Sequence, residues 1–368
     1  MPKTKSILSI FLAPMILSTA MQSGVARDKP PSFTMDDMAR TVSAWLSAPH
    51  ADHSTRASRY WSSKQAVPES CAVCHSEPGF ILSLSHDSVA APVFEHPLAA
   101  TAIGCATCHN SSAQTLESVS FPSGASKSGL GSSAVCSQCH KGRASGDDVR
   151  ISTSLHAEDE LLDAPRFISI HRGAAAATLG GSDVRGGYEY KGRSYAGAFR
   201  HVPSAGTCTA CHDPHSTAVA EDACLSCHRG VTALRDIRTQ HRDFDGDGDI
   251  AGGISTEIEG LQEQLLSAMK EYARQVSGTP LAYSPGQFPY FFEVSGHDKR
   301  AAADVGPAQE YRAWTPRLLR AAYNYQFANE DRGAYVHNPR YVLQLLHDSL
   351  VDLSEKIPLE IRGRPRPS

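Results

Sequence analysis

Ten cysteines and five histidines of this 368-residue chain form one repeated short pattern. Every cysteine lies in a Cys-x-x-Cys-His unit, and five such units account for all ten cysteines. Two thiols three positions apart can bond to the two vinyl groups of one haem, and the adjoining histidine then ligates its iron. The pattern therefore predicts five covalently bound haem c groups. We number the units motif 1 to motif 5 in chain order: 71–75, 105–109, 136–140, 208–212 and 224–228.

Two other kinds of site also contain Cys-x-x-Cys pairs. A four-cysteine zinc site combines two of them, and a thioredoxin-like redox site uses one. Neither requires a histidine directly after the second cysteine, which all five units have. Haem attachment is therefore the favoured interpretation. The predicted attachment cysteines and proximal iron ligands are Cys71, Cys74, His75, Cys105, Cys108, His109, Cys136, Cys139, His140, Cys208, Cys211, His212, Cys224, Cys227 and His228.

The ligand on the other side of each iron determines the redox character of the haem. Only three of the six methionines, Met35, Met38 and Met269, lie beyond residue 26, where a leader peptide is expected to end, whereas twelve histidines remain outside the motifs. Methionine ligation raises the potential of haem iron. Its scarcity predicts low-spin, bis-histidine haems of low potential, a ligation that is typical of electron transfer.

The distal ligands must come from these twelve histidines. A lone histidine is by default a surface or hydrogen-bonded residue, so only about five of them are expected to bind iron. His215 lies three residues after His212, where it faces away from its own haem and can reach a neighbouring one. His347 is expected to be an exposed helix residue. The other candidates from local context are His50, His171, His201 and His337, followed by His96, His86 and His241.

The elements that must position these ligands divide the chain into three predicted parts. Residues 1–26 have two lysines, an apolar run and small residues, which indicates a cleaved signal peptide. A retained membrane anchor is the alternative, but the run is short and contains Pro14. Residues 27–240 hold every motif and show poor periodicity, as expected of a pentahaem-binding domain. Residues 241–368 contain no cysteine and form a predicted helical region that packs on the haem domain.

Three helices are predicted in the C-terminal region. Apolar residues recur at three- and four-residue steps from Ile254 to Tyr272. Thr315-Pro316 and Asn338-Pro339 each combine a capping residue with a first-turn proline, which marks the start of a helix. We therefore predict a mainly α fold with extensive irregular structure around the haems and a C-terminal helical bundle. A short β-hairpin is predicted near 186–196, where a Gly-rich segment contains several tyrosines.

An acidic loop follows the last motif. Asp243, Asp245 and Asp247, with Gly248, match the first half of a calcium-binding loop, and Asp249 follows directly. The twelfth position is Ile254 instead of glutamate, so a complete EF-hand is absent. A shortened calcium site at the four aspartates and a solvated acidic turn are both compatible with this pattern.

The sequence resembles exported multihaem c-type cytochromes of environmental bacteria and archaea, here with five haems, over roughly Trp45 to Leu353. The resemblance implies the distal iron ligands His50, His171, His201, His215 and His337. The segment 295–311 departs from the acidic insert of that family, so nothing is carried over for it. The resemblance is carried by 49–52, 121–124, 139–145, 175–178, 186–190, 211–215, 243–249 and 334–339.

Composition restricts the partners. A net charge of -4 without a basic stripe gives no indication of a nucleic-acid partner. No later stretch reaches transmembrane length, so the mature chain is expected to lack a membrane span. The expected partners are redox proteins of the periplasm or the extracellular space, and a homo-oligomer or filament is possible on this evidence.

The motifs favour an electron carrier over an enzyme. Catalysis at a haem requires an open or displaceable sixth position, which pentahaem nitrite reductases typically mark with Cys-x-x-Cys-Lys, and the chain has no such motif. Catalytic haems with histidine ligation are known, so a multihaem reductase of nitrite, hydroxylamine or a sulfur oxyanion is the alternative. A filament-forming cytochrome or a subunit beside a catalytic partner is the third hypothesis.

Overall fold

The computed structural model describes residues 33–52, 54, 60, 67–84, 100–163, 165–294, 309–361 and 364–368. The predicted signal peptide, His86 and His96 lie outside these residues, as does most of the segment 295–311. Among the described residues, no helix has both the length and the apolar character needed to cross a membrane.

Helices dominate the described chain, in agreement with the predicted mainly α class. Strands occur as two short antiparallel pairs, β1 with β2 and β3 with β4. The elements in chain order are α1 Met35–Leu46, α3 Glu69–His75, α4 Glu77–Leu84, α5 Cys105–Cys108, α6 Ser111–Gln114, β1 Ser118–Ser120, β2 Ser126–Ser128, α7 Ser133–His140, α8 Gly146–Thr153, α9 Ala175–Gly180, η1 Gly181–Asp183, η2 Pro203–Ala205, η3 Cys208–Ala210, α10 Glu221–Leu225, η4 Leu234–Asp236, α11 Ile254–Tyr272, η5 Ala273–Ser277, β3 Leu281–Tyr283, β4 Phe291–Glu293, α12 Pro316–Glu330, α13 Ala334–His337 and α14 Pro339–Leu353.

The three predicted C-terminal helices are confirmed as α11, α12 and α14. The Thr315 hydroxyl accepts the Leu318 N–H at 3.2 Å and the Asn338 side chain accepts the Tyr341 N–H at 3.2 Å, so both predicted caps are present. Each cap is followed by a proline in the first turn, where its missing N–H costs no hydrogen bond.

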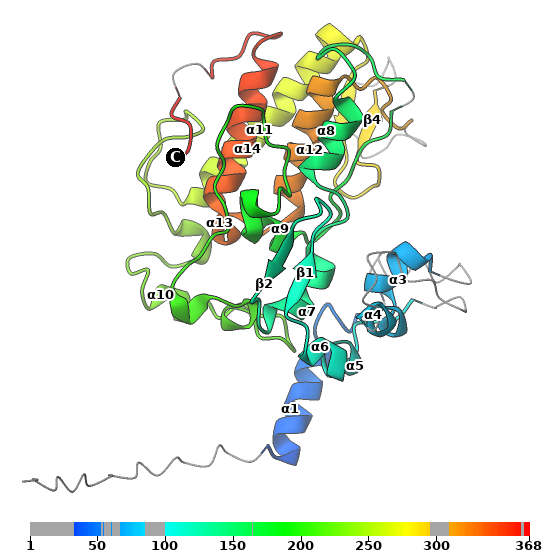
Figure 1. Cartoon of the computed structure of the whole chain (residues 1–368). Coiled ribbons are helices and arrows are strands. Elements are labelled where there is room, and N and C mark those ends of the chain that lie inside the picture. Colours follow the sequence, from blue (N-terminus) through cyan, green and yellow to red (C-terminus); the bar gives the residue numbers. More distant parts are fainter. Residues whose placement is uncertain are drawn as a thin grey trace, which may run out of the picture.

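These three helices pack against one another and contain much of the hydrophobic core (Figure 1). Leu261 and Leu265 of α11 are fully buried, as are Leu345 and Leu346 of α14. Each such side chain contributes about 1.5–3 kcal/mol through its removal from water. In Figure 1 the bundle occupies the upper part of the molecule, and the motif-bearing helices α3, α5 and α7 lie in the lower part.

The prediction of a β-hairpin near 186–196 is wrong. This segment is irregular, with a turn at 191–192. Its backbone N–H groups find side-chain acceptors on the bundle instead of a partner strand. Asn324 of α12 accepts the Tyr188 N–H at 2.7 Å and donates to the Tyr188 carbonyl at 3.0 Å. The Tyr341 hydroxyl of α14 accepts the Gly187 N–H at 3.1 Å.

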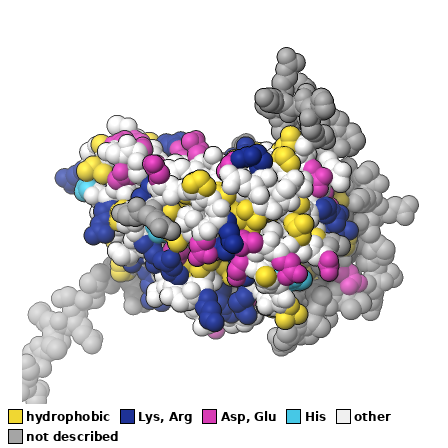
Figure 2. Space-filling view, turned by 90° about the horizontal axis from the view of Figure 1, so that it is seen from above, with side chains coloured by type: hydrophobic (Ala, Val, Ile, Leu, Met, Phe, Trp, Pro, Cys, Tyr) yellow, Lys and Arg dark blue, Asp and Glu magenta, His cyan; other side chains and the backbone are white. Residues whose placement is uncertain are grey.

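The face seen from above carries interspersed acidic and basic side chains (Figure 2). No large area of one sign is visible there, in line with the sequence, which has no basic stripe. This distribution gives no sign of a nucleic-acid interface on that face.

The expectation that His347 is an exposed helix residue is wrong, because only 5% of it is exposed. It lies on α14, whose buried residues surround most of the helix. The segment 186–196 and the C-terminal residues 364–368 both contact α14 and cover its outer side. His347 Nδ1 lies 3.2 Å from an oxygen of the neighbouring Asp348.

Asp348 links α14 to both of these covering segments. Its carboxylate accepts the Tyr195 hydroxyl at 2.7 Å and two guanidinium hydrogen bonds from Arg366 at 2.8 and 2.9 Å. Burial alone would raise the pKa of Asp348, but hydrogen bonds from His347, Arg366 and Tyr195 lower it to about 2. The ionised form is therefore stabilised by folding.

We predict that Asp348→Asn lowers the stability of the folded protein at pH 7 by about 2–3 kcal/mol, the free energy that corresponds to a pKa of about 2 against about 4 in the unfolded chain. A depressed carboxyl pKa contributes stability that is complete above pH ~4 and is lost as the pH falls toward 2. The difference in thermal unfolding midpoint between wild type and variant, followed by circular dichroism, should therefore shrink between pH 4 and pH 2.

Glu259→Gln is the matched control for Asp348→Asn. It also replaces a carboxylate by an amide, but its ion pair with Arg235 is exposed on both sides. Exposed ion pairs contribute about 0–1 kcal/mol. A loss at Asp348→Asn no larger than that of the control would contradict the assigned role of Asp348.

Candidate functional site

The histidine of each motif has a second histidine ring beside it. The partner comes in every case from outside that motif, and the ring centroids lie 5.8 to 6.5 Å apart. The pairs are His75 with His171 at 6.0 Å, His109 with His215 at 6.1 Å, His140 with His50 at 6.5 Å, His212 with His337 at 6.3 Å, and His228 with His201 at 5.8 Å.

This separation fits two imidazoles that share one metal ion. A metal–imidazole nitrogen bond is about 2.0–2.1 Å long. Two such bonds on opposite sides of one ion, with half a ring beyond each nitrogen, place the centroids about 6 Å apart. The partners are the five histidines that the family resemblance implied as distal ligands, and sequence context alone had left them among several candidates.

Short helical turns position the motif cysteines and histidines. In α5 the His109 N–H donates to the Cys105 carbonyl at 2.8 Å, and in motif 4 the His212 N–H donates to the Cys208 carbonyl at 2.8 Å. Residues three apart lie on the same face of such a turn. Both thiols of a motif therefore face the same side, and the histidine follows at the end of the turn.

One tight turn serves two histidine pairs. His171 has φ 79° and Gly173 has φ 71°, so the backbone reverses between Ile170 and Ala174. A positive φ is uncommon for a residue other than glycine and costs of order 1–3 kcal/mol. The turn directs the His171 ring to His75 and brings the Gly173 carbonyl to His140.

Three of the paired rings have an oxygen acceptor at Nδ1. His140 Nδ1 lies 2.7 Å from the Gly173 carbonyl, which can only accept, so this nitrogen carries the proton. His212 Nδ1 makes a longer contact of 3.4 Å with the Thr217 carbonyl. His337 Nδ1 lies 2.8 Å from the carboxylate of Asp331. A proton held at Nδ1 leaves the Nε2 lone pair available to a metal, the usual arrangement in metal-bound histidines.

Burial keeps several of the rings neutral. It lowers the pKa of His171 to about 4, with further contributions from Arg143, His75 and Arg172. Burial, and then the charge of Arg143, also lowers the pKa of His75. Metal ions bind the neutral imidazole. These rings are therefore in the protonation state that ligation requires.

The cysteines of different motifs lie close to one another. The Cys74 thiol of motif 1 lies beside Cys139 of motif 3, and Cys136 of motif 3 lies beside Cys208 of motif 4, so that the thiols of each pair shift one another's pKa. Cys108 of motif 2 is near enough to raise the pKa of both motif 3 thiols, after the larger effects of those neighbours and of burial. The motifs therefore form one connected cluster with motif 3 at its centre.

Motif 5 extends this cluster from motif 4. Burial raises the pKa of Cys211, and the nearby Cys224 raises it further. The sixteen-residue spacing of Cys208 and Cys224 had indicated that the last two motifs lie close together. None of the ten cysteines forms a disulfide, and each of these residues is at least partly exposed. Free cysteines are usually among the most buried residues, so this exposure leaves room for an attached group.

Sequence reasoning ranked His241 as a further candidate, but this residue is exposed in the loop before the aspartates. It did not find the Nδ1 acceptors, the carbonyls of Gly173 and Thr217 and the carboxylate of Asp331. Gly173 follows His171 by two residues, and Asp331 precedes His337 by six. Neither spacing is a recognised signal, because the acceptors are brought to the rings by the turns between them.

The acidic loop brings three of its four aspartates together. Carboxylate oxygens of Asp243, Asp245 and Asp247 lie within 4.8 Å of one another. Burial raises the pKa of Asp245 to about 6, and the nearby carboxylates of Glu257, Asp247 and Asp243 add to this effect. Asp249 is outside this group, and its carboxylate accepts the Ala251 N–H at 2.7 Å. The calcium site stays a prediction, now centred on the first three aspartates.

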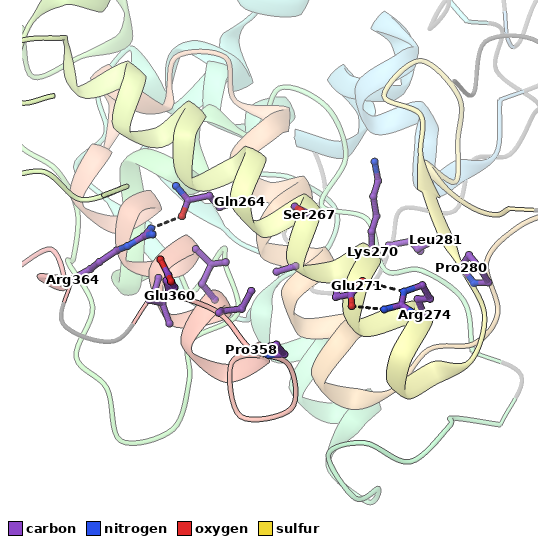
Figure 3. A pocket seen from close by; sticks show the side chains of 14 residues that line it. Gln264, Ser267, Lys270, Glu271, Arg274, Pro280, Leu281, Pro358, Glu360 and Arg364 are labelled. Carbon is purple, nitrogen blue, oxygen red and sulfur yellow. Dashed lines mark hydrogen bonds and ion pairs between the residues drawn. The ribbon is translucent and has the colours of Figure 1, made fainter. Parts of the chain in front are cut away.

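An open surface cavity lies away from the histidine pairs, between α11, β3 and the residues after α14 (Figure 3). Its lining includes no cysteine or histidine. Glu271 pairs with Arg274 and Gln264 accepts a hydrogen bond from Arg364, so these groups satisfy one another. The candidate site is therefore the motif cluster and not this cavity.

Over part of its length the chain is similar to polyhaem c-type cytochromes. It is 26% identical over 255 residues to C-type polyheme cytochrome OmcC of Geobacter sulfurreducens strain PCA, a match that covers 59% of this chain and 29% of the relative. It is 25% identical over 275 residues to C-type polyheme cytochrome OmcB of strain DL-1 / KN400, covering 64% and 32%. The aligned part therefore spans about a third of these curated relatives. No protein-family model and no solved structure matches the chain.

We predict that calcium raises the thermal unfolding midpoint of the protein and that a chelator lowers it, because an ion that binds only the folded state stabilises it. Asp247→Asn should reduce this response, and Asp249→Asn should leave it unchanged. The two residues are closely matched, since each carboxylate accepts a backbone N–H at 2.7 Å, and Asp249 accepts a second, from Gly252, at 3.3 Å. A midpoint that is the same with and without chelator would identify the loop as a solvated acidic turn.

Proposed function

We propose that this chain is an exported c-type cytochrome that binds five haems through its motifs and passes electrons between redox partners of the periplasm or the extracellular space. The observation that carries the proposal is the pairing of every motif histidine with a second histidine about 6 Å away. The partial similarity to polyhaem c-type cytochromes supports the same class.

The residues fit haem c in three respects. Each motif offers two thiols on one face of a turn, each proximal histidine has a distal partner, and Nδ1 acceptors orient several of the rings. When bound, haem supplies reversible one-electron chemistry at its iron. The paired histidines would hold the iron, and the groups around them would set its potential. Two neutral nitrogen ligands favour a low-spin iron of low potential.

The contacts between motifs support an order for the haems. Thiols of different motifs lie close together between motifs 1 and 3 and between motifs 3 and 4, where the helices that carry them are in contact. The nearness of Cys211 to Cys224 continues this order to motif 5. Motif 2 joins at two places, through Cys108 beside motif 3 and through His215, which follows the motif 4 histidine by three residues. The proposed path therefore runs from motif 1 through motifs 3 and 4 to motif 5, with motif 2 as a branch.

The histidine pairing also weighs against the reductase alternative. Reduction of nitrite, hydroxylamine or a sulfur oxyanion requires an iron with an open or displaceable position. Each motif histidine instead faces a ring that can fill the sixth position. An assembly role, as a filament or as a subunit, is compatible with the same site, and size-exclusion chromatography with negative-stain microscopy distinguishes these states from a monomeric carrier.

We predict five haems per chain by the pyridine haemochrome assay and only low-spin ferric signals in the electron paramagnetic resonance spectrum of the oxidised protein. Bis-histidine ligation produces this spin state because both axial positions are filled by nitrogen. A stable high-spin signal that changes when nitrite or hydroxylamine is added would contradict the carrier and support the reductase.

We predict that His171→Ala and His337→Ala each convert one of the five haems to a high-spin form, since each removes one sixth ligand. The other four haems should keep their low-spin signals. His241→Ala is the control, because this histidine is exposed and lies outside the pairs. An unchanged spectrum in either variant would show that the corresponding pair does not hold an iron.

A further inference from the structure

The His212–His337 pair differs from the other described pairs in the acceptor at its ring nitrogen. The described Nδ1 acceptors of His140 and His212 are neutral backbone carbonyls. His337 Nδ1 instead lies 2.9 and 2.8 Å from the two carboxylate oxygens of Asp331. The acceptor at this ring is therefore an anion, and both of its oxygens lie within hydrogen-bond distance of the same N–H. This difference matters only if the pair holds a haem iron, so the inference below rests on the proposed function.

Asp331 is held in place and shielded from water. Only 4% of its side chain is exposed. The Gly333 N–H donates to its Oδ1 at 3.0 Å, and the Thr178 hydroxyl provides a further hydrogen bond. In a buried setting a negative charge is screened less than on the surface, so it acts more strongly on its neighbours.

The place of Asp331 in the chain gives little reason for an acid there. It directly follows α12, and a helix C-terminus carries a partial negative charge that disfavours a carboxylate. Its carboxylate accepts hydrogen bonds from the Gly333 N–H, the Thr178 hydroxyl and the His337 ring. The contact to Gly333 belongs to a local turn that a neutral asparagine could also make, so the contact in which the charge matters is the one to His337.

We propose that Asp331 tunes the potential of the iron held by His212 and His337, making it the lowest of the five. By accepting a hydrogen bond from the Nδ1–H group, the carboxylate gives the imidazole part of the character of an imidazolate, which is a stronger electron donor to iron. The buried negative charge also favours the ferric state over the ferrous state, because the ferric ion carries one more positive charge. Both effects stabilise the oxidised form. Asp331 is thus a positioning and tuning residue that acts through His337.

The position of this pair gives the low potential a role. Motif 4 lies between motif 3 and motif 5 in the proposed order. In this order, electrons that move between motif 5 and motif 3 must pass the site that Asp331 controls. Its potential then sets how readily the two ends of the chain exchange electrons.

The test is a redox titration of the holoprotein, followed by visible absorption and electron paramagnetic resonance, for wild type and Asp331→Asn. The asparagine oxygen can still accept a hydrogen bond from the Nδ1–H group, so the ring should keep its orientation and the iron should stay low-spin. One of five potentials should rise, with about a tenfold change in the ratio of reduced to oxidised iron at a fixed potential, which is 59 mV for a one-electron couple. The low-spin signal that disappears in His337→Ala identifies this haem.

Asp213→Asn is the matched control. Asp213 directly follows His212, so it is close to the same iron, but it is exposed and its carboxylate accepts hydrogen bonds from Ser216 and the His215 N–H. Water screens an exposed charge, so this variant should leave all five potentials unchanged. A shift at Asp213→Asn as large as that at Asp331→Asn would overturn the assignment to Asp331.

Two further results would overturn the inference without touching the proposed function. The first is that Asp331→Asn leaves all five potentials unchanged and all haems low-spin. The second is that Asp331→Asn converts one haem to high-spin, which would show that Asp331 only holds the His337 ring in place. Wild type gives a second measurement that does not depend on the folding of Asp331→Asn. There, the signal assigned through His337→Ala must be the last to disappear on reduction, and any other order contradicts the proposal. Absence of haem would instead refute the proposed function.

Discussion

The pairing of histidine rings across distant parts of the chain is the constraint on which the rest of the structure depends. Each motif histidine must lie about 6 Å from a ring that another segment supplies. The backbone between them therefore follows the positions of the rings. This explains why the motif region consists of short helical turns and irregular segments, such as the strained turn at His171, where regular helices or sheets would not bring both partners together.

The C-terminal bundle takes part in this arrangement and does more than cover it. Asp331 directly follows α12, His337 ends the short helix α13, and the Glu330 carbonyl of α12 accepts the Gly173 N–H at 3.1 Å. The same turn that carries His171 is thereby attached to the end of α12. The densely packed core of α11, α12 and α14 gives these ligands a fixed base. Contacts of this kind cross the boundary at residue 240, although composition changes sharply there.

The proposed order of the haems is unlike a simple line in the sequence. Motif 3 touches motif 1 and motif 4 and lies near motif 2, so the centre of the cluster is neither the first nor the last motif of the chain. Such a branched cluster can accept electrons at more than one edge.

The sequence by itself determined the helices of the bundle, and its Cys-x-x-Cys-His units predict the chemistry of the motifs. The Cys-x-x-Cys-His units and the caps at Thr315 and Asn338 are local signals, because the groups that must meet are at most a few residues apart. Local context also supported the distal histidines, but it left several alternatives, and only the family resemblance selected among them.

Tertiary structure decided what depends on segments far apart. It buried His347 where an exposed residue was expected, satisfied the backbone of 186–196 with side chains from the bundle where a hairpin was expected, and delivered a buried carboxylate to His337. Burial and hydrogen-bond partners are properties of the packed chain. A residue's own neighbours in sequence carry no record of them, since a turn of a few residues is enough to change which group a side chain meets.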